Sequence, residues 1–199
     1  SSVAVQDFNG DTYLDIMVAL PSFHDIAVYT GYGNGTFYQY SVFSPGYDSR
    51  PNNLILADLN GDSHMDIVFR YNKNTIGLIL AYDNATFTNI RKFAAGNAAQ
   101  SDPVAVTDLN CDGYFDIVLA HFNPTNIGAL VGTDDGDFQY KVIGDRETFR
   151  SWGDIPLIAV GDFNNDGYKD IVAKHKSSAG AFHMLLNACQ CCLTGVINA

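Results

Sequence analysis

The chain has 199 residues, 47% of them hydrophobic and 17% charged, a composition typical of a globular fold rather than of disorder. Acidic residues outnumber basic residues 22 to 11, and the formal net charge of -11 argues against nucleic acid or an anionic membrane surface as a partner, because both bind through basic patches. No apolar run has the length of a transmembrane helix and no signal peptide is recognisable, so we expect no direct membrane insertion and a chain that was processed or cut from a longer protein.

The N-terminal part of the chain predicts four short strands. An acidic loop at 7–15, of sequence DFNGDTYLD, is flanked by runs rich in Val and Ile at 3–6 and 15–20, which predict the first two strands. Apolar runs at 26–32 and 38–43, separated by the turn sequence GNGTF, predict a third and a fourth strand. Nothing in this order of elements indicates a helix.

The same order of elements returns three more times along the chain. The loop pattern D-x-N-x-D-x-x-x-D begins at Asp7, Asp58, Asp108 and Asp162, so that successive copies start 51, 50 and 54 residues apart. Strand-like runs precede and follow every copy. The fourth repeat departs from the others, because NACQCCL stands where the GNGTF-type turn is expected, and this is typical of a terminal capping repeat.

A unit of about 50 residues with four short strands has the size of a β-propeller blade. We therefore predict an all-β fold in which residues 1–199 form one β-propeller domain with four-stranded blades at about 1–50, 51–100, 101–153 and 154–199. The four blades form a closed four-bladed ring or part of a larger propeller, for example one with seven blades.

The chemistry of the repeated loop indicates a bound cation. Oxygen-bearing side chains at positions 1, 3, 5 and 9 are ligands for a hard ion such as calcium, and position 7 would contribute its backbone carbonyl. The four loops hold twelve of the 22 acidic residues, and four divalent ions would change the formal charge from -11 to -3.

The loops differ from the EF-hand in two respects: strands rather than helices flank them, and no Glu stands at position 12. Glycine occupies position 6 only as Gly113 and Gly167, whereas Thr12 and Ser63 hold that position in the first two loops. We expect those two loops to bind an ion more weakly or to adopt a slightly different turn.

The loops, the DIV strands that follow them and the GNGTF-type turns resemble the FG-GAP/VCBS repeat family, to which integrin α-subunit propellers belong. The resemblance covers essentially the whole chain. It implies calcium between the first two strands of each blade and an extracellular or cell-surface protein. The ligands that it implies are Asp7, Asn9, Asp11, Asp15, Asp58, Asn60, Asp62, Asp66, Asp108, Asn110, Asp112, Asp116, Asp162, Asn164, Asp166 and Asp170, with the backbone carbonyls of Tyr13, His64, Tyr114 and Tyr168.

Two further features fit an extracellular location. Asn34 and Asn84 begin N-glycosylation sequons in equivalent turns of the first two repeats, although Asn-Gly is also an ordinary turn signal. The chain has four cysteines, Cys111, Cys189, Cys191 and Cys192, of which some would pair in an oxidising compartment. A zinc site formed by the C-terminal cysteines and His183 is a weaker alternative.

Other residues give weaker signals. His121 and His175 occupy equivalent positions after the third and fourth loops, where we expect blade packing rather than catalysis. Trp152 follows Arg146 and Arg150 in the longest connector between repeats, and it either fills a gap between blades or belongs to a ligand site. No catalytic motif is present, so we expect no catalytic residues and no enzymatic activity.

We therefore predict a calcium-stabilised extracellular binding or adhesion module that recognises a protein or glycan ligand. The alternatives are an accessory propeller domain of a secreted enzyme, such as a polysaccharide-active hydrolase or lyase, and a lectin. The sequence leaves the ligand and the binding face open.

Overall fold

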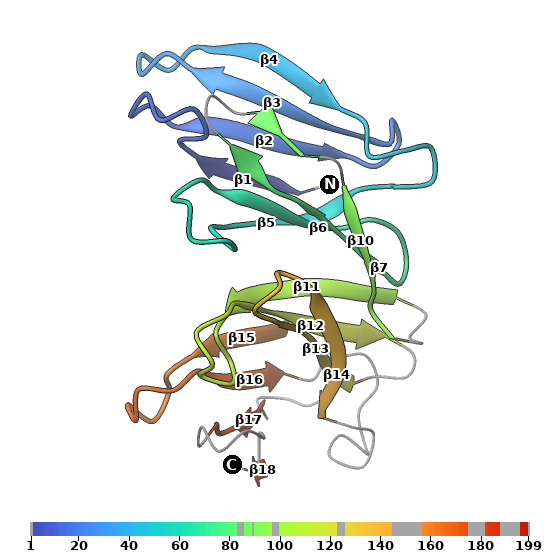
Figure 1. The fold of residues 1–199 in the computed structure, drawn as a ribbon, viewed down its shortest axis with the longest axis vertical. Coiled ribbons are helices and arrows are strands. Elements are labelled where there is room, and N and C mark those ends of the chain that lie inside the picture. The colour runs from blue at the N-terminus through green and yellow to red at the C-terminus, as the bar shows by residue number, and fades with distance from the viewer. Residues whose placement is uncertain are drawn as a thin grey trace. The chain divides into compact units, whose positions relative to one another are not determined.

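The computed structural model describes residues 2–82, 86–88, 90–96, 100–122, 126–144, 157–174, 182–187 and 196–198. All regular secondary structure in these ranges is β-strand, and they contain no helix with the length and hydropathy needed to span a membrane. The predicted all-β class is therefore confirmed (Figure 1).

The first two repeats each form a four-stranded antiparallel sheet in which strands that follow one another in the repeat are neighbours. The first sheet has the order β1-β2-β3-β4 and contains β1 (Val3–Gln6), β2 (Asp15–Leu20), β3 (Asp25–Gly31) and β4 (Phe37–Phe43). The second sheet contains β5 (Asn52–Ala57), β6 (Asp66–Arg70), β7 (Thr75–Ile79) and β10 (Arg91–Ala94). A separate two-stranded hairpin of β8 (Ala81–Tyr82) and β9 (Thr86–Phe87) lies between β7 and β10 in the sequence.

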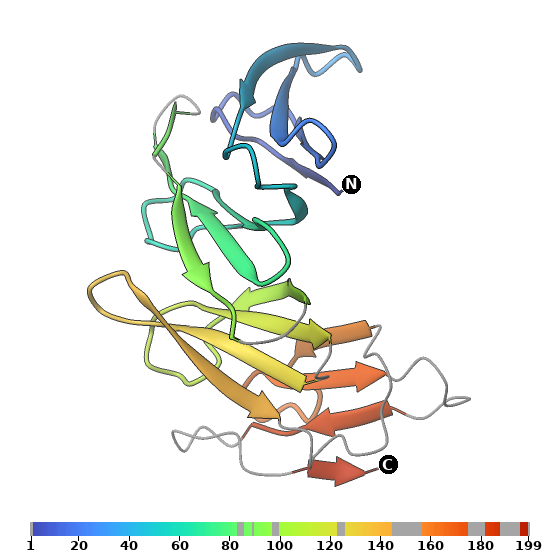
Figure 2. The ribbon, with the colours of Figure 1, turned by 90° about the vertical axis from the view of Figure 1, so that its right-hand side faces the viewer.

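The third and fourth repeats form sheets with the same strand order. The third contains β11 (Gln100–Thr107), β12 (Asp116–Phe122), β13 (Asn126–Gly132) and β14 (Phe138–Gly144). The fourth contains β15 (Leu157–Gly161), β16 (Asp170–Lys174), β17 (Phe182–Leu185) and β18 (Val196–Asn198), seen in orange and red in Figure 2. Although the fourth repeat lacks the expected turn sequence, β18 pairs with β17 and completes a four-stranded sheet.

The chain divides into two compact units, Ser1–Ala94 and Ala95–Ala199, each of which contains two of the four sheets. Within the first unit, the opening strands of the two sheets, β1 and β5, lie against each other. Within the second unit, β11 and β15 do the same. This is the packing expected of neighbouring propeller blades. The prediction that 1–199 forms a single domain stays a prediction.

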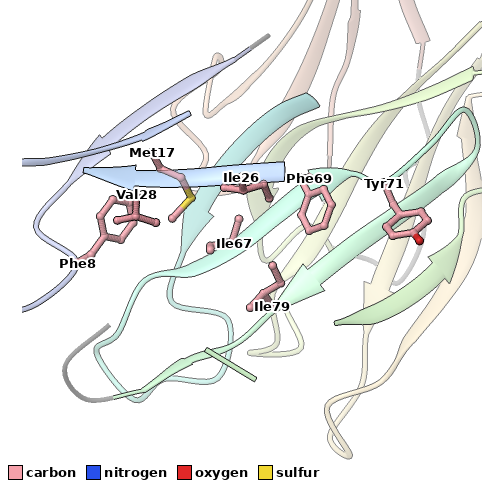
Figure 3. Packing of buried hydrophobic residues seen from close by; sticks show 8 residues of the cluster. All are labelled: Phe8, Met17, Ile26, Val28, Ile67, Phe69, Tyr71 and Ile79. Carbon is pink, nitrogen blue, oxygen red and sulfur yellow. The ribbon is translucent and has the colours of Figure 1, made fainter. Parts of the chain in front are cut away.

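The core of the first unit lies between its two sheets. Met17, Ile26 and Val28 from β2 and β3 pack with Ile67 and the other buried residues of β6 and β7, as the sticks in Figure 3 show. Along β2, buried residues alternate with less buried ones, because successive side chains of a strand point to opposite faces. The loop at 7–15 joins this core through Phe8, which is buried among the same residues.

The core of the second unit has the same construction. Val118 and Ile127 from the third sheet pack with Ile171, Ala173 and Leu185 from the fourth sheet. Leu109, the residue equivalent to Phe8, anchors the third loop in this core. In both units, therefore, the second residue of an aspartate loop is fixed by hydrophobic packing between sheets.

Candidate metal centres

The first aspartate of each loop organises the turn that follows it. Its Oδ1 accepts a hydrogen bond from the backbone N–H of position 5 at 3.0–3.2 Å, and its Oδ2 accepts one from the N–H of position 6 at 2.8–3.0 Å. The residues in this position are Asp7, Asp58, Asp108 and Asp162. All four loops therefore wrap their backbone N–H groups around one carboxylate, in the manner of an extended Asx turn.

The side chains at positions 3 and 5 continue this pattern. The Oδ1 of the asparagine at position 3 accepts the N–H of position 5 at 2.9–3.2 Å, and the Oδ1 of the aspartate at position 5 accepts the N–H of position 7 at 2.8–2.9 Å. The asparagine amide also donates to the Oδ2 of position 5 at 2.8–2.9 Å. Positions 1, 3, 5 and 7 are thus brought together in every loop.

The aspartate at position 9 has a different environment. Asp15, Asp66, Asp116 and Asp170 are only 0–1% exposed. The Oδ2 of each accepts the N–H of position 2 of its loop at 2.8–3.0 Å, and the Oδ1 accepts an N–H at or just after the end of the third strand at 2.8–2.9 Å. Each of these carboxylates therefore clamps the start of its loop to a neighbouring segment, a structural role that the sequence pattern did not predict.

The end of the third strand lies close to the loop, and this close approach explains why glycine stands at residues 31 and 132. A Cβ at Gly31 would contact the carbonyl oxygen of Leu14, and a Cβ at Gly132 would contact that of Phe115. Leu14 and Phe115 are the residues at position 8, next to the buried aspartate. Since the contacting atoms are backbone atoms, no side-chain rotation would relieve the overlap, and only glycine fits at these two positions.

All four loops adopt the same left-handed backbone conformation at position 6. Here φ is 75° at Thr12, 69° at Ser63, 89° at Gly113 and 90° at Gly167. The expectation of a different turn in the first two loops is therefore wrong, because the hydrogen bonds from positions 1, 3 and 5 impose the turn regardless of the residue. Thr12 and Ser63 adopt a conformation that is unfavourable for a residue with a Cβ.

The environments of the loop carboxylates affect their pKa values in opposite directions. Burial raises the pKa of Asp66 and of Asp116 above the ordinary value of an aspartate. The hydrogen bond from the backbone N–H of His64 lowers the pKa of Asp62, which is exposed. The second loop thus combines a solvent-facing carboxylate, whose charged form is favoured, with a buried one, whose charged form is disfavoured by burial in spite of its two backbone hydrogen bonds.

Within the described ranges, no group of three or more His, Cys, Asp or Glu side chains is arranged to hold a metal ion by itself. Each loop offers instead two carboxylates at positions 1 and 5, the amide oxygen at position 3 and the backbone carbonyl at position 7. This all-oxygen set fits a hard cation such as calcium. The carboxylate at position 9 is set apart by its burial, since oxygens at positions 1, 3 and 5 accept backbone hydrogen bonds as well.

Asn187 was not recognised from the sequence as a residue of the site. It is 3% exposed and lies just after β17, where its backbone N–H donates to Asp170. Its side-chain amide donates to the carbonyl oxygen of Leu109 at 2.5 Å, and so connects the fourth sheet to the third loop. An asparagine after a strand is a weak signal, and no pattern in the sequence links it to a loop 78 residues away.

Of the four cysteines and the two sequon asparagines, only Cys111 and Asn34 lie within the described part of the chain. Cys111 is disulfide-bonded, and the chain's three other cysteines lie outside the described residues. Asn34 is exposed at the turn before β4, where its Oδ1 accepts hydrogen bonds from the backbone N–H and the hydroxyl of Thr36 at 3.0 and 2.6 Å. The predicted sequon residue Asn84 lies outside the described residues.

His121 is part of a buried polar network in the third sheet. Its Nδ1 lies 2.7 Å from the hydroxyl of Ser101 and its Nε2 lies 3.2 Å from that of Tyr140. Ser101 and His121 are both 0% exposed, and burial lowers the pKa of His121 to about 4. The serine and histidine therefore have no surface that a substrate could reach, in agreement with the predicted packing role of His121.

Most of the remaining residues that the sequence singled out fall in segments that the structure does not describe. Arg146, Arg150, Trp152 and His175 lie outside the described residues, as do Cys189, Cys191 and Cys192. The predicted zinc alternative involved these cysteines and His183. His183 lies in β17, opposite Ala173 of β16.

A family model described as "FG-GAP-like repeat" matches the chain three times, over residues 7–69, 58–119 and 108–173. Each match begins at the first aspartate of a loop, and together the matches cover residues 7–173 without a gap. No curated protein matches the chain significantly.

Solved structures with a similar fold include the following two. The crystal structure of a protein from Lactobacillus plantarum aligns with a TM-score of 0.61 and 16% identity, over 92% of this chain and 50% of that protein. The Tc holotoxin pore of Photorhabdus luminescens aligns with a TM-score of 0.50 and 18% identity, over 100% of this chain and 9% of that protein. The chain thus spans half of the L. plantarum protein, and identities this low show similarity of fold alone.

Proposed function

Because the chain belongs to the FG-GAP-like repeat family, we propose that it is a calcium-stabilised extracellular module whose propeller-type blades present loops to a protein or glycan ligand. The observation that carries this proposal is the shared hydrogen-bond scaffold of the four aspartate loops. Turn formation alone does not require carboxylates at both position 1 and position 5 of every loop. A cation held by positions 1, 3, 5 and 7 would offset the repulsion between them.

Calcium would have a structural role in this proposal. Bound calcium supplies positive charge to each loop and links the two strands that the loop joins. The chain's own contribution is the set of backbone hydrogen bonds that hold the side chains of positions 1, 3 and 5 within one turn. Extracellular calcium modules bind with dissociation constants of roughly 10⁻⁴ to 10⁻³ M, which suits the exterior of a cell and not the cytosol.

Two observations support an extracellular location. The disulfide bond of Cys111 would persist in an oxidising compartment and not in a reducing cytosol. Asn34 is exposed in an Asn-Gly-Thr sequon, so its side chain is open to glycosylation. Both residues belong to elements of the repeat: Cys111 lies within the third loop and Asn34 lies in the turn before β4.

A binding role is supported by large apolar side chains on the loops. Positions 7 and 8 expose Tyr13 by 46%, Leu14 by 62%, Tyr114 by 43%, Phe115 by 41% and Tyr168 by 37%. Exposed aromatic side chains on a rigid support are typical of contact sites with other macromolecules. We therefore propose adhesion or ligand recognition rather than catalysis as the role of the chain.

Thermal unfolding with and without calcium tests this proposal. We expect the melting temperature to be higher in excess calcium than in excess chelator, and the difference to shrink when an exposed position-5 aspartate is replaced, as in Asp62→Ala or Asp166→Ala. Asp134→Ala is the matched control, because it removes one exposed charge outside the loops. Equal melting temperatures in calcium and chelator would refute the calcium proposal.

The binding role needs a separate experiment. The chain, immobilised in calcium, should retain at least one component of a panel of glycans and matrix proteins, and retention should be lost in chelator. Binding to nothing on either panel would contradict the adhesion proposal and leave the calcium result unaffected.

A further inference from the structure

The two most exposed large hydrophobic side chains among the described residues lie at the end of the first sheet away from its aspartate loop. Tyr47 is 87% exposed and Phe23 is 72% exposed. Phe23 stands in the turn between β2 and β3, and Tyr47 stands in the connection from β4 to β5. Because successive strands of the sheet are antiparallel, both segments lie at the end opposite the loop at 7–15.

The ring of Tyr47 has a fixed support. It stacks on the ring of His24, with the ring centroids 5.4 Å apart and the planes inclined by 30°. His24 is held in turn by Ser49, which is 0% exposed and whose hydroxyl donates to the carbonyl oxygen of His24 at 3.1 Å. The backbone N–H of Ser49 donates to the carbonyl oxygen of Gly46 at 3.0 Å, which closes the turn that carries Tyr47. The contacts on one face of the Tyr47 ring therefore direct its other face to solvent.

Basic residues are concentrated at the same end of the first unit. This unit has five basic residues, and six of its nine acidic residues stand in the two aspartate loops at the opposite end. Arg50 and Lys73 are exposed, in the connection from β4 to β5 and in the turn between β6 and β7. Lys92 donates to the hydroxyl of Tyr71 at 2.8 Å and lies 4.0 Å from the centre of its ring. A Cβ at Gly46 would lie 3.0 Å from the same hydroxyl, so Lys92 adjoins the connection from β4 to β5.

The charge of the whole chain has little influence at this end. The acidic side chains here, Asp25 and Asp48, are outnumbered by the three basic ones just described and Arg70. The aspartate loops are distant, because β2, which joins the two ends, has six residues and is about 20 Å long. Repulsion between exposed charges is largely screened beyond about 8 Å at physiological ionic strength. The formal charge of -11 therefore does not prevent an anion from approaching this end.

Exposed aromatic faces beside basic groups fit an anionic polysaccharide. The C–H groups of a sugar ring carry partial positive charge and pack on the negative face of an aromatic ring. Arginine and lysine bind sulfate or carboxylate groups through charge-assisted hydrogen bonds. An acidic peptide would use the basic groups, but it has no sugar ring to cover the exposed face of Tyr47.

We propose that this end of the first unit binds an anionic polysaccharide through aromatic stacking and ionic contacts. The residues that form the site are Phe23, Tyr47, Arg50, Lys73 and Lys92. The inference rests on the binding role in the proposed function and deepens it, because it names the class of ligand and the surface that receives it. Asn34 lies in the turn between β3 and β4, at the loop end of the sheet, so a glycan there would leave the site open.

The affinity of the whole chain for dextran sulfate, measured in calcium by isothermal titration calorimetry, tests the ionic contacts. Dextran of the same length is the neutral control, because it has the same sugar backbone without sulfate. Arg50→Gln and Lys73→Gln should each weaken the binding of dextran sulfate about fivefold. Lys141→Gln is the matched control, since it removes an exposed lysine of the second unit and changes the net charge equally.

Tyr47→Ala tests the aromatic contact. It should weaken the binding of dextran sulfate at least about threefold without a change in net charge. Tyr32→Ala is the control, because it removes a tyrosine that is 57% exposed at the loop end of the same sheet, and it should leave the affinity unchanged.

The proposal is overturned if dextran sulfate does not bind, if dextran binds as tightly, if Lys141→Gln weakens binding as much as Lys73→Gln, or if Tyr47→Ala has no effect. Poly-L-glutamate is the acidic polypeptide probe, and equal affinity for it would show that the site recognises charge alone and would overturn the proposal too. If another glycan or a matrix protein is retained and none of these substitutions weakens its binding, the proposed function is supported and this inference fails.

Discussion

Replacing Thr12 with glycine should stabilise the first unit. Thr12 stands at position 6 of its loop with φ of 75°, whereas Gly113 and Gly167 hold the equivalent position with φ of 89° and 90°. A left-handed conformation costs a residue with a Cβ about 1–2 kcal/mol. The greater entropy of glycine in the unfolded state offsets roughly 0.5–1 kcal/mol of this gain. The net increase in the free energy of unfolding is therefore about 0.5–1 kcal/mol.

Apart from the backbone strain, Thr12→Gly removes few interactions of the folded chain. The side chain is exposed, and the hydrogen bond from Thr12 to Asp7 uses the backbone N–H, which glycine keeps. Thr12→Ala is the matched control, because it removes the hydroxyl and keeps the Cβ. Gly113→Ala introduces the same strain into the third loop and should lower stability by about 1 kcal/mol.

Urea unfolding followed by circular dichroism measures these differences, and hydrogen exchange assigns them to a unit. Thr12→Gly should raise the urea midpoint with an unchanged m-value, and should raise the melting temperature by about 2 °C for a chain of this size. The strain argument fails if Thr12→Gly is no more stable than Thr12→Ala, because both variants lack the hydroxyl and only one relieves the backbone.

Three further predictions concern the loops and the third sheet. Asp116→Asn should lower stability by about 1–3 kcal/mol already in chelator, because its amide NH2 would face a buried backbone N–H. Asp112→Asn keeps the oxygen that accepts the N–H of Tyr114 and loses only an exposed hydrogen bond from the Asn110 amide, so its effect should be much larger in calcium than in chelator. Denaturation of both variants in each buffer tests this difference, which is contradicted if the two variants respond alike. Gly132→Ala should lower stability by about 1–3 kcal/mol, because the added Cβ would overlap the carbonyl oxygen of Phe115. Gly161→Ala is the control, because a Cβ at residue 161 would make only ordinary van der Waals contacts. Equal melting temperatures for the two variants would contradict the packing argument. Burial lowers the pKa of His121 to about 4 from 6.5, so the unfolded chain binds a proton that the folded chain excludes, and stability should fall as pH drops from 6.5 to 4, by on the order of 3 kcal/mol. His121→Gln should reduce the dependence of stability on pH between pH 4 and pH 6.5. The same dependence in the variant would show that His121 is not its cause.

The strands could be predicted from the sequence because their signals are local. Val- and Ile-rich runs bounded by turn residues coincide with the first and second strands of the sheets, and the fourfold recurrence of the loop defined the repeat. The residues of the candidate sites could be identified in the same way, since oxygen-bearing side chains at alternate positions of a short loop are typical of a hard-cation site. Repetition made each of these inferences stronger than a single copy would allow.

The features that were missed depend on contacts that the pattern does not encode. Asp15 and Asp11 look equivalent in the motif. However, Asp15 is the first residue of β2, which pairs with β3, and its carboxylate is buried there and accepts the backbone N–H of Gly31. The left-handed turn at Thr12 follows from hydrogen bonds that override the preference of the residue. Asn187 reaches Leu109 only because the third and fourth sheets pack together.

The most direct test of the central claim is the number of calcium ions that the chain binds. Equilibrium dialysis of the whole chain against increasing calcium should reach saturation at four ions, one for each loop, with dissociation constants of roughly 10⁻⁴ to 10⁻³ M. Replacing the position-5 aspartate of one loop by alanine should reduce the number bound by one. Weak uptake that never saturates, or a stoichiometry that these substitutions leave unchanged, would contradict the assignment of the four loops as calcium sites.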